Sequence, residues 1–503
     1  MADFESNATS PPPTPPESGR GAGGRPGQRD LTTGPIASTL LLFALPTLGS
    51  NILQTLNGSI NAIWVGHFLG EAALAATSNA TIIMFLLFGA VFGFGMAATI
   101  LVGQAFGRRD LDAARRAFGS AIGLVLGASV VVGTLGWIFA PEILTALATP
   151  GESMPLALTY LRVIFLGLPA TMLLTVMMMG VRGSGDSISP MVFGGLAALL
   201  DAGLNPLFIL GLGPIPRLGI AGSALASVIG TTLATLAFAI YLYRRDQPLR
   251  LRGSELRYLL PEGALARTIV AKGLPIGAQM LVIATAGLAM LGLVNREGVD
   301  TTAAYGVTQQ LWAYVQMPAM AIGAAVSAMA AQNIGAGRWD RVSAITRAGL
   351  LYNVVLTGGM VAVLMLFDRP LLTLFLGNAS TALPIAQHIT LIATWSFILF
   401  GMTMVFFGTV RANGAVLGPL AILFVGMYPV RLGFALALDP LLGADAIWWS
   451  FPLGSIANVG MAALYYRSSA WRGGALLAPE GARGCEQRSH ADVEPGAAMK
   501  PAG

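Results

Sequence analysis

Cysteine is nearly absent from this sequence of 503 residues, and histidine is rare. The single cysteine, Cys485, excludes an intramolecular disulfide, a CxxC metal site and a framework for cysteine-based catalysis. The three histidines, His67, His388 and His490, lie far apart along the chain, which argues against a metal cluster. We therefore expect neither a bound metal nor a cofactor.

Charge is also scarce. Asp, Glu, Lys and Arg make up 11% of the chain, against roughly 25% in soluble domains. Hydrophobic residues make up 55%, and the mean hydropathy is +0.70. A soluble fold of this size has too little polar surface to cover so much apolar area. The composition predicts an all-α integral membrane protein, with the lipid bilayer as a partner and no nucleic-acid partner.

Long apolar runs are abundant, and roughly 20 apolar residues suffice to cross a bilayer core of about 30 Å. We predict twelve transmembrane helices near 37–63, 74–101, 117–140, 156–180, 188–212, 219–243, 268–294, 303–330, 348–367, 385–410, 415–438 and 446–466. The expected organisation is a disordered cytoplasmic tail (1–35), an N-lobe (36–243), a basic cytoplasmic linker (244–267), a C-lobe (268–467) and a second disordered tail (468–503).

The placement of Lys and Arg predicts the orientation. With the N-terminus inside, 24 of the 29 Lys and Arg residues fall in inside loops and tails, and three fall in outside loops. The last two, Arg162 and Arg431, lie within predicted spans. Because cytoplasmic loops carry the excess of positive charge, we expect both termini in the cytoplasm, in an inner (plasma) membrane protein.

An internal repeat predicts the architecture. Gln104-x-x-Gly107 recurs as Gln332-x-x-Gly335, and Arg182-x-x-Gly185 recurs as Arg411-x-x-Gly414, at offsets of 228 and 229 residues. Each repeat holds six spans, an even number, so both halves enter the membrane from the same side. We expect two six-helix bundles related by an axis along the membrane normal, which is a parallel repeat.

Several short stretches occur in an order that resembles the multidrug and toxic compound extrusion (MATE) transporters. They are Ala44-Leu-Pro46, Gln54-Thr55, Asn61-Ala-Ile-Trp-Val-Gly66, Gly103-Gln-Ala-Phe-Gly107, Arg182-Gly-Ser-Gly185-Asp186, Asp201-x-x-x-Asn205-Pro206, Gly219-x-x-Gly222-Ser-Ala-x-Ala226 and Gln332-x-x-Gly335. The resemblance implies a V-shaped pair of lobes, alternating access, and export of organic, often cationic compounds driven by inward flow of H⁺ or Na⁺. It implies a transporter rather than an enzyme, and we expect a monomer.

Asp201 is the one carboxylate placed well inside a predicted span, where an ionisable group is costly. Asn205 lies four residues on and shares its helix face. Because burial disfavours the charged form of a carboxyl, Asp201 is a candidate proton carrier. Alternatively, ionised Asp201 with amide and carbonyl oxygens holds a hard cation such as Na⁺, or the pair simply joins helices through a hydrogen bond.

The first span carries a polar stripe. Thr47, Ser50, Gln54, Asn57 and Asn61 fall within an arc of roughly 80° at about 100° per residue. Such a stripe faces protein or a water-filled cavity rather than lipid. We assign Asn61 and Gln54, with Asp201 and Asn205, to ion or proton coupling, and Asn57 to substrate binding. Interhelical hydrogen bonding is the alternative for the whole stripe.

The sequence departs from the family pattern at these positions. The position of Asn61 is commonly Asp in the family, and the usual order in the fifth span is Asn, three residues, then Asp-Pro, the reverse of Asp201 and Asn205-Pro206. Some members carry a Glu in the seventh span, where Met280–Ala284 is apolar here. A single titratable group favours one H⁺ per cycle over Na⁺.

The eighth span begins with amides, aromatic rings and a methionine, which suit a pliant site for organic cations. We assign Tyr305, Gln309, Trp312 and Met317 to substrate binding; packing is the plainer alternative for each.

Three other functions remain as alternatives. A flippase for lipid-linked oligosaccharides or polyprenyl carriers needs a large basic cavity. Arg162 and Arg431 are the only arginines within predicted spans, which argues against this function. A membrane-embedded enzyme such as a polyprenyl transferase needs clustered carboxylates, and none occur within spans. A channel is favoured by charged rings or filter repeats, and none occur in the sequence.

Overall fold

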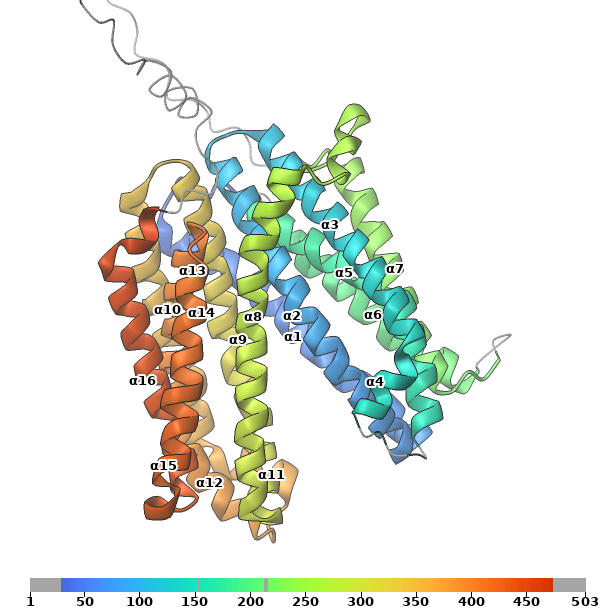
Figure 1. The fold of residues 1–503 in the computed structure, drawn as a ribbon, viewed down its shortest axis with the longest axis vertical. Helices are drawn as coiled ribbons and strands as arrows, with labels where there is room; N and C mark the ends of the chain where they lie inside the picture. Colours follow the sequence, from blue (N-terminus) through green and yellow to red (C-terminus); the bar gives the residue numbers. More distant parts are fainter. Residues whose placement is uncertain (1–28, 148, 150, 152, 212–215, 474–503) are drawn as a thin grey trace, which may run out of the picture.

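The computed structural model describes residues 29–211 and 216–473, apart from positions 148, 150 and 152, and its helices form two bundles (Figure 1). The first bundle holds α1 (Ile36–Leu69), α2 (Glu71–Gly107), α3 (Leu111–Ile138), α4 (Ala140–Ala146), α5 (Met154–Gly183), α6 (Ile188–Leu210) and α7 (Ile220–Arg244). The second holds α8 (Gly263–Val294), α9 (Val299–Gly335), α10 (Trp339–Leu366), α11 (Asp368–Leu376), α12 (Ala382–Ala393), α13 (Ser396–Ala412), α14 (Leu417–Val425), α15 (Gly433–Leu442) and α16 (Asp445–Ser468).

The expected membrane-spanning helices are confirmed. Within the described residues, eleven helices are long and apolar enough to cross a bilayer. The pair α12 and α13, bent by 44° between Ala393 and Ser396, makes a twelfth span. The span from Leu417 to Leu442 is continuous through a π-helical turn at Gly426–Leu432, which joins α14 to α15. The described part of the chain has no β-strand, so the all-α class predicted from composition holds.

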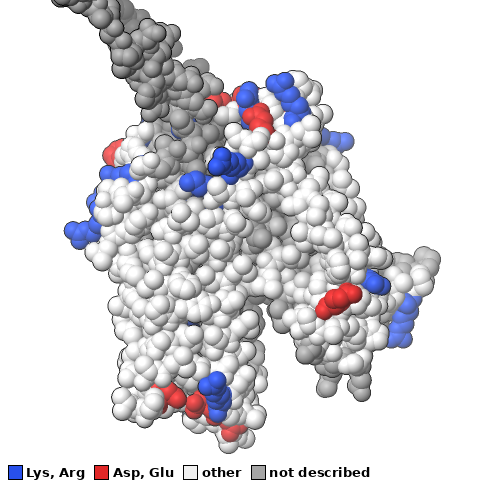
Figure 2. Space-filling view, in the orientation of Figure 1, with Lys and Arg blue, Asp and Glu red and all other residues white. Residues whose placement is uncertain are grey.

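The two bundles meet at one end and diverge toward the other (Figure 1). Contacts between the bundles come mainly from α2 packing on α8 and α9, and from α1 packing on α9. Figure 2 shows a hollow between the bundles at the diverging end. Lys and Arg gather at the joined end, where the chain passes from α7 to α8, with smaller charged groups at the tips of the bundles.

The repeated Gln-x-x-Gly motif forms the crossing of α2 and α9 at the joined end. A Cβ atom at Gly107 would overlap the carbonyl oxygen of Gln332, and one at Gly335 would overlap the carbonyl oxygen of Gln104. Each glycine therefore lies against the backbone of the other motif. Small residues allow such close helix approach in membrane proteins, and here the repeat supplies one glycine from each bundle.

The two glutamines of the motif make reciprocal hydrogen bonds between the bundles. Gln104 Nε2 donates to the carbonyl oxygen of Ala412 at 2.7 Å, at the C-terminus of α13. Gln332 Nε2 donates to the carbonyl oxygen of Gly183 at 2.9 Å, at the C-terminus of α5. The last carbonyls of a helix have no partner within the helix. Each bundle thus caps a helix of the other, which closes this end.

Residues 29–35 differ from the expected disordered tail, whose remaining positions 1–28 lie outside the described residues. Leu31 is fully buried, and its backbone N–H and C=O bond Gln332 Oε1 at 3.2 Å and Asn333 Nδ2 at 3.0 Å. Arg29 N donates to Gly185 O of the other bundle at 3.3 Å. The segment is ordered because it satisfies polar groups of both bundles at the closed end.

The expected tail 468–503 also has an ordered start, and 474–503 lie outside the described residues. Trp471, in a short 3-10 turn at Ala470–Gly473, is buried. Its carbonyl accepts from Asn413 Nδ2 at 2.7 Å, and its ring stacks on Tyr466 with centroids 5.5 Å apart. The start of this segment is therefore ordered. The ring of Trp471 is buried against Tyr466, and its backbone carbonyl has a hydrogen-bond partner.

The basic segment 244–267 is largely outside regular helices, apart from a 3-10 turn at Gly253–Leu259, until α8 begins at Gly263. It packs on the first bundle: Arg115 of α3 pairs with Glu255 at 2.7 Å and donates to the carbonyl of Pro248 at 2.8 Å.

At the start of α6, Asp186 accepts hydrogen bonds from Ser189 N and Ser189 Oγ at 2.9 and 2.6 Å. Burial raises the pKa of the Asp186 carboxyl, and the Ser189 bonds partly oppose this.

A leucine at Gly107 is expected to force α2 and α9 apart at the closed end. Overpacking of this kind costs about 1–3 kcal/mol, so the thermal unfolding midpoint in detergent should fall. Spin labels at Asp112 and Asp340 should report a longer distance. Gly127 has no neighbouring atom within 4 Å of its potential Cβ, so Gly127→Leu is the matched control. Equal midpoints and label distances in the two variants would contradict the proposed closure.

Candidate functional site

Two cavities adjoin along α2, and Thr81 and Phe85 line both. The N-lobe cavity, of about 420 Å³, is lined by α1, α2, α5, α6 and α7. The C-lobe cavity, of about 510 Å³, is lined by α2, α8, α9, α13, the π-helical turn and α16. Each lobe of the repeat therefore holds its own cavity, and only α2 contributes side chains to both.

Asp201 of α6 is buried in the wall of the N-lobe cavity and accepts hydrogen bonds from three helices. Asn57 Nδ2 of α1 donates to Asp201 Oδ2 at 2.9 Å. Ser227 Oγ of α7 donates to Oδ1 at 2.8 Å. Asn205 Nδ2, one turn further along α6, donates to Oδ1 at 3.1 Å. The carboxyl joins α1, α6 and α7, and the shared face of Asp201 and Asn205 expected from their spacing is present.

The polar stripe of α1 divides along its length. Thr47 and Ser50 donate to carbonyls of their own helix, at 3.2 and 3.1 Å. Gln54 and Asn57 line the N-lobe cavity beside Asp201. Asn61 Oδ1 accepts from Ser223 Oγ of α7 at 2.8 Å. Only the middle of the stripe faces the cavity, and Asn61 joins two helices instead.

Ser227 is a member of the Asp201 cluster that the sequence did not single out. Its hydroxyl comes from α7, 26 residues along the chain, so no spacing rule links it to Asp201. The oxygens Asn57 Oδ1 and Asn205 Oδ1 are buried and have no hydrogen-bond partner among the described residues. The carboxylate of Asp201 thus accepts from three donors, and the side-chain oxygens of Asn57 and Asn205 can still accept hydrogen bonds.

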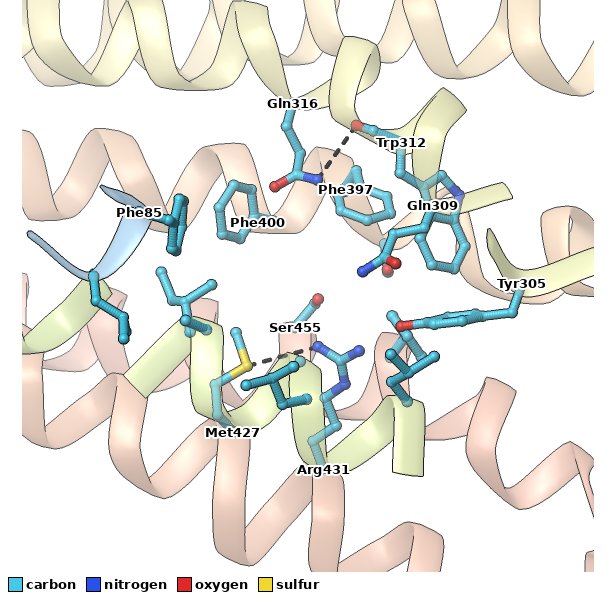
Figure 3. Close-up of a pocket in the computed structure, with 18 of the residues that line it drawn as sticks. Phe85, Tyr305, Gln309, Trp312, Gln316, Phe397, Phe400, Met427, Arg431 and Ser455 are labelled. Atoms are coloured by element: carbon cyan, nitrogen blue, oxygen red, sulfur yellow. Dashed lines mark hydrogen bonds between the residues drawn. The ribbon is translucent and has the colours of Figure 1, made fainter. Parts of the chain in front are cut away.

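The expected substrate residues of the eighth span divide between cavity and core. Tyr305, Gln309 and Trp312 line the C-lobe cavity (Figure 3). Trp312 is buried, and its Nε1 donates to Thr394 Oγ1 at 2.8 Å, which fixes the ring. Met317 is also buried but does not line this cavity. Gln316, about one turn past Trp312, lines the cavity, whereas Met317 lies one residue further and is rotated away from it, by about 140° from Trp312.

Arg431 is the second residue that the sequence did not place in a site, although it lies in a predicted span. The π-helical turn carries its side chain into the C-lobe cavity, where the guanidinium points toward Gln309, Tyr305 and Ser455 (Figure 3). The cost of an ionisable group within a membrane is the signal that identified Asp201. The same signal applies to this arginine.

The two halves of the chain match one family model. Residues 46–207 and residues 275–436 each match MatE. The second match begins 229 residues after the first, which is the offset of the internal repeat. The chain is 32% identical over 431 residues to the probable multidrug resistance protein YoeA of Bacillus subtilis, covering 85% of this chain and 93% of that protein. It is 22% identical over 447 residues to the probable multidrug resistance protein NorM of Thermotoga maritima, covering 88% and 95%.

Solved structures share the fold. An outward-facing multidrug resistance MATE family transporter of the MOP superfamily aligns with a TM-score of 0.81, covering 88% of this chain and 98% of that one, at 20% identity. A crystal structure of MATE in complex with MaD3S aligns with the same score, identity and coverage. The fold of this chain is therefore shared with these proteins.

Removing the Ser227 hydroxyl is expected to destabilise the N-lobe. A hydrogen bond to a charged group contributes about 1.5–3 kcal/mol, so Ser227→Ala should lower the unfolding midpoint. The loss should shrink in acid, where Asp201 becomes protonated and is a weaker acceptor. The matched control is Ser59→Ala, because Ser59 Oγ bonds only Thr55 O of its own helix at 3.2 Å. A loss that is equal in both variants, or constant with pH, would argue against a charged Asp201 cluster.

Proposed function

The chain belongs to the MatE family of transporters, and on that premise we propose that it exports organic, cationic or amphipathic small molecules in exchange for H⁺ by alternating access. Its family is one of multi-pass membrane transporters, not of enzymes, and we propose the plasma membrane as its location. We also propose a monomer as the transporting unit.

The observation that carries the proposal is the environment of Asp201. Among the described residues, Asp186 and Asp201 are the buried carboxylates, and only Asp201 lies within a candidate span. Asp201 also lines a cavity. A carboxyl in this position exchanges protons with water in the cavity when the cavity is open to one side. With a single such group, one H⁺ enters per cycle.

The hydrogen-bond cluster accommodates both protonation states. In the ionised state, Asn57, Asn205 and Ser227 all donate to Asp201. In the protonated state, the carboxyl O–H needs an acceptor. An amide that rotates by half a turn presents its oxygen in place of its N–H, and the Ser227 hydroxyl also accepts. Protonation therefore rearranges side chains that join α1, α6 and α7, and this couples the proton to the packing of the N-lobe.

Alternating access needs one closed and one open end. The reciprocal bonds of Gln104 and Gln332 lie at the closed end, and the hollow between the bundles lies at the other (Figure 2). The α7–α8 connection and the described ends of the chain lie at the closed end (Figure 1). With both termini in the cytoplasm, the hollow faces outward, where H⁺ enters and substrate leaves.

Uptake of fluorescent organic dyes into everted membrane vesicles tests the coupling. We expect an acidic vesicle lumen alone to drive uptake, because Asp201 takes its proton from that side. Asp201→Asn cannot carry a proton and should abolish the uptake driven by the pH gradient. Asp186→Asn is the matched control, since Asp186 is buried but caps α6, and it should retain uptake.

The sodium alternative is measured in the same vesicles. Uptake driven by a Na⁺ gradient without a pH gradient would replace the proton proposal. The oxygens of Asp201, Asn57 and Asn205 would then be the hard ligands that such a cation prefers. If neither gradient moves any dye of a broad panel, export of drug-like compounds is wrong for this chain.

The orientation has its own test, which uses the single cysteine. With both termini cytoplasmic, a membrane-impermeant maleimide should label Cys485 in everted vesicles and leave it unlabelled in intact cells or right-side-out vesicles. The Cys485→Ser variant controls for labelling of other proteins. Labelling of Cys485 from the outside would reverse the proposed orientation, and with it the side to which the hollow opens.

A further inference from the structure

The C-lobe cavity contains a cationic side chain that the proposed proton cycle does not use. Arg431 extends from the π-helical turn, and its guanidinium points into the open part of the cavity (Figure 3). Gln309 and Tyr305 of α9 and Ser455 of α16 point toward the same space. Polar groups from three elements therefore converge on one point within an otherwise apolar cavity.

Packing holds the guanidinium of Arg431 and leaves its N–H donors without a strong acceptor among the described residues. Its Cζ lies 3.5 Å from the centroid of the Phe451 ring, so the planar group stacks on the aromatic face. Stacking leaves the N–H donors of an arginine at the edge of its plane. Nη1 contacts only the sulfur of Met427, a weak acceptor, at 3.7 Å. Nε is buried and has no hydrogen-bond partner among the described residues.

No carboxylate in the described part of the chain compensates the charge of Arg431. The residues that line the cavity include no Asp or Glu, and none of the ion pairs found among the described residues involves Arg431. A cation held within a membrane protein without a partner is costly. An anion in the cavity removes that cost, and a purely cationic ligand increases it.

The rest of the cavity matches an apolar body attached to such an anion. Most of its lining is aromatic or aliphatic, with Phe85, Phe397 and Phe400 opposite the polar cluster (Figure 3). Tyr305 and Gln309 can donate or accept hydrogen bonds beside the guanidinium. The volume of about 510 Å³ is in the range of pockets for drug-sized ligands.

We propose that Arg431 binds the acidic group of an amphipathic organic anion, a carboxylate, sulfonate or phosphate on an aromatic or apolar body, in the C-lobe cavity. This inference rests on the proposed export function, and among the substrates proposed there it selects amphipathic acids, rather than cations, as the class that the C-lobe cavity takes. The two lobes then have opposite polarity: Asp201 in the N-lobe handles the proton, and Arg431 in the C-lobe handles the acidic substrate.

Equilibrium binding to the purified full chain in detergent micelles tests the site without any ion gradient. The probes are dansylglycine, which is a carboxylate, and its uncharged methyl ester. Energy transfer from tryptophan to the dansyl group reports binding, and Trp312, which lines the cavity, is one of the donors. We expect the wild type to bind the acid at least ten-fold more tightly than the ester. Arg431→Gln should lose that preference while its affinity for the ester is unchanged.

Two further variants separate charge from folding. Arg431→Lys keeps a positive charge and should keep part of the preference for the acid. Arg162→Gln is the matched control, because Arg162 also stacks on an aromatic ring, Trp137 at 4.8 Å, but does not line this cavity. Equal binding of acid and ester by the wild type would overturn the proposal. The proposal would also be overturned if the Arg431→Gln protein elutes as a monodisperse species and still prefers the acid over the ester as the wild type does.

Acidic lipid headgroups offer the same chemistry as free organic acids, and competition distinguishes the two sources. Displacement of dansylglycine by phosphatidylglycerol, but not by phosphatidylcholine, assigns the site to a lipid headgroup. Resistance to both lipids assigns it to a free organic acid. Because no gradient is imposed, these results do not depend on proton coupling. Failure of dye uptake in Asp201→Asn vesicles would likewise say nothing about Arg431.

Discussion

The crossing of α2 and α9 is the contact on which the arrangement of the two bundles depends. Gly107 and Gly335 allow each backbone to lie against the other, and Gln104 and Gln332 cap helices of the opposite bundle. Glycine is needed because any Cβ would overlap a carbonyl there. Glutamine is needed because a helix C-terminus leaves carbonyls unsatisfied. With the bundles joined at this end, their divergence leaves both cavities beside α2.

The two halves have kept the same packing and acquired different chemistry. The closing motif is used symmetrically, with one copy from each repeat. The cavities are not symmetric, because a carboxylate lies in one and a guanidinium in the other. Packing at the crossing of α2 and α9 requires the two Gln-x-x-Gly motifs to stay complementary to each other. The wall of one cavity is under no such constraint from the wall of the other. This difference underlies the proposed division of roles, with the proton in one lobe and the substrate in the other.

The candidate site could be predicted from the sequence only in part. Asp201 and Asn205 were found because a charged group within an apolar span is costly and because residues four apart share a helix face. Ser227 and the hydrogen bond of Asn57 to Asp201 could not be predicted, since contacts between α6, α7 and α1 depend on how the helices rotate against one another. Arg431 carried the same signal as Asp201, but a cavity beside it is not visible in the sequence.

The sequence by itself determined the membrane fold, the number of spans and the repeat. Those properties depend on apolar length and on identities at a fixed offset, which are linear features of the chain. Tertiary structure alone decided that residues 29–35 and Trp471 are ordered, because polar segments become ordered only where distant groups such as Gln332 and Asn413 accept or donate their hydrogen bonds. It also decided which polar side chains face a cavity, because helix rotation is determined by packing against neighbours that the linear pattern does not specify.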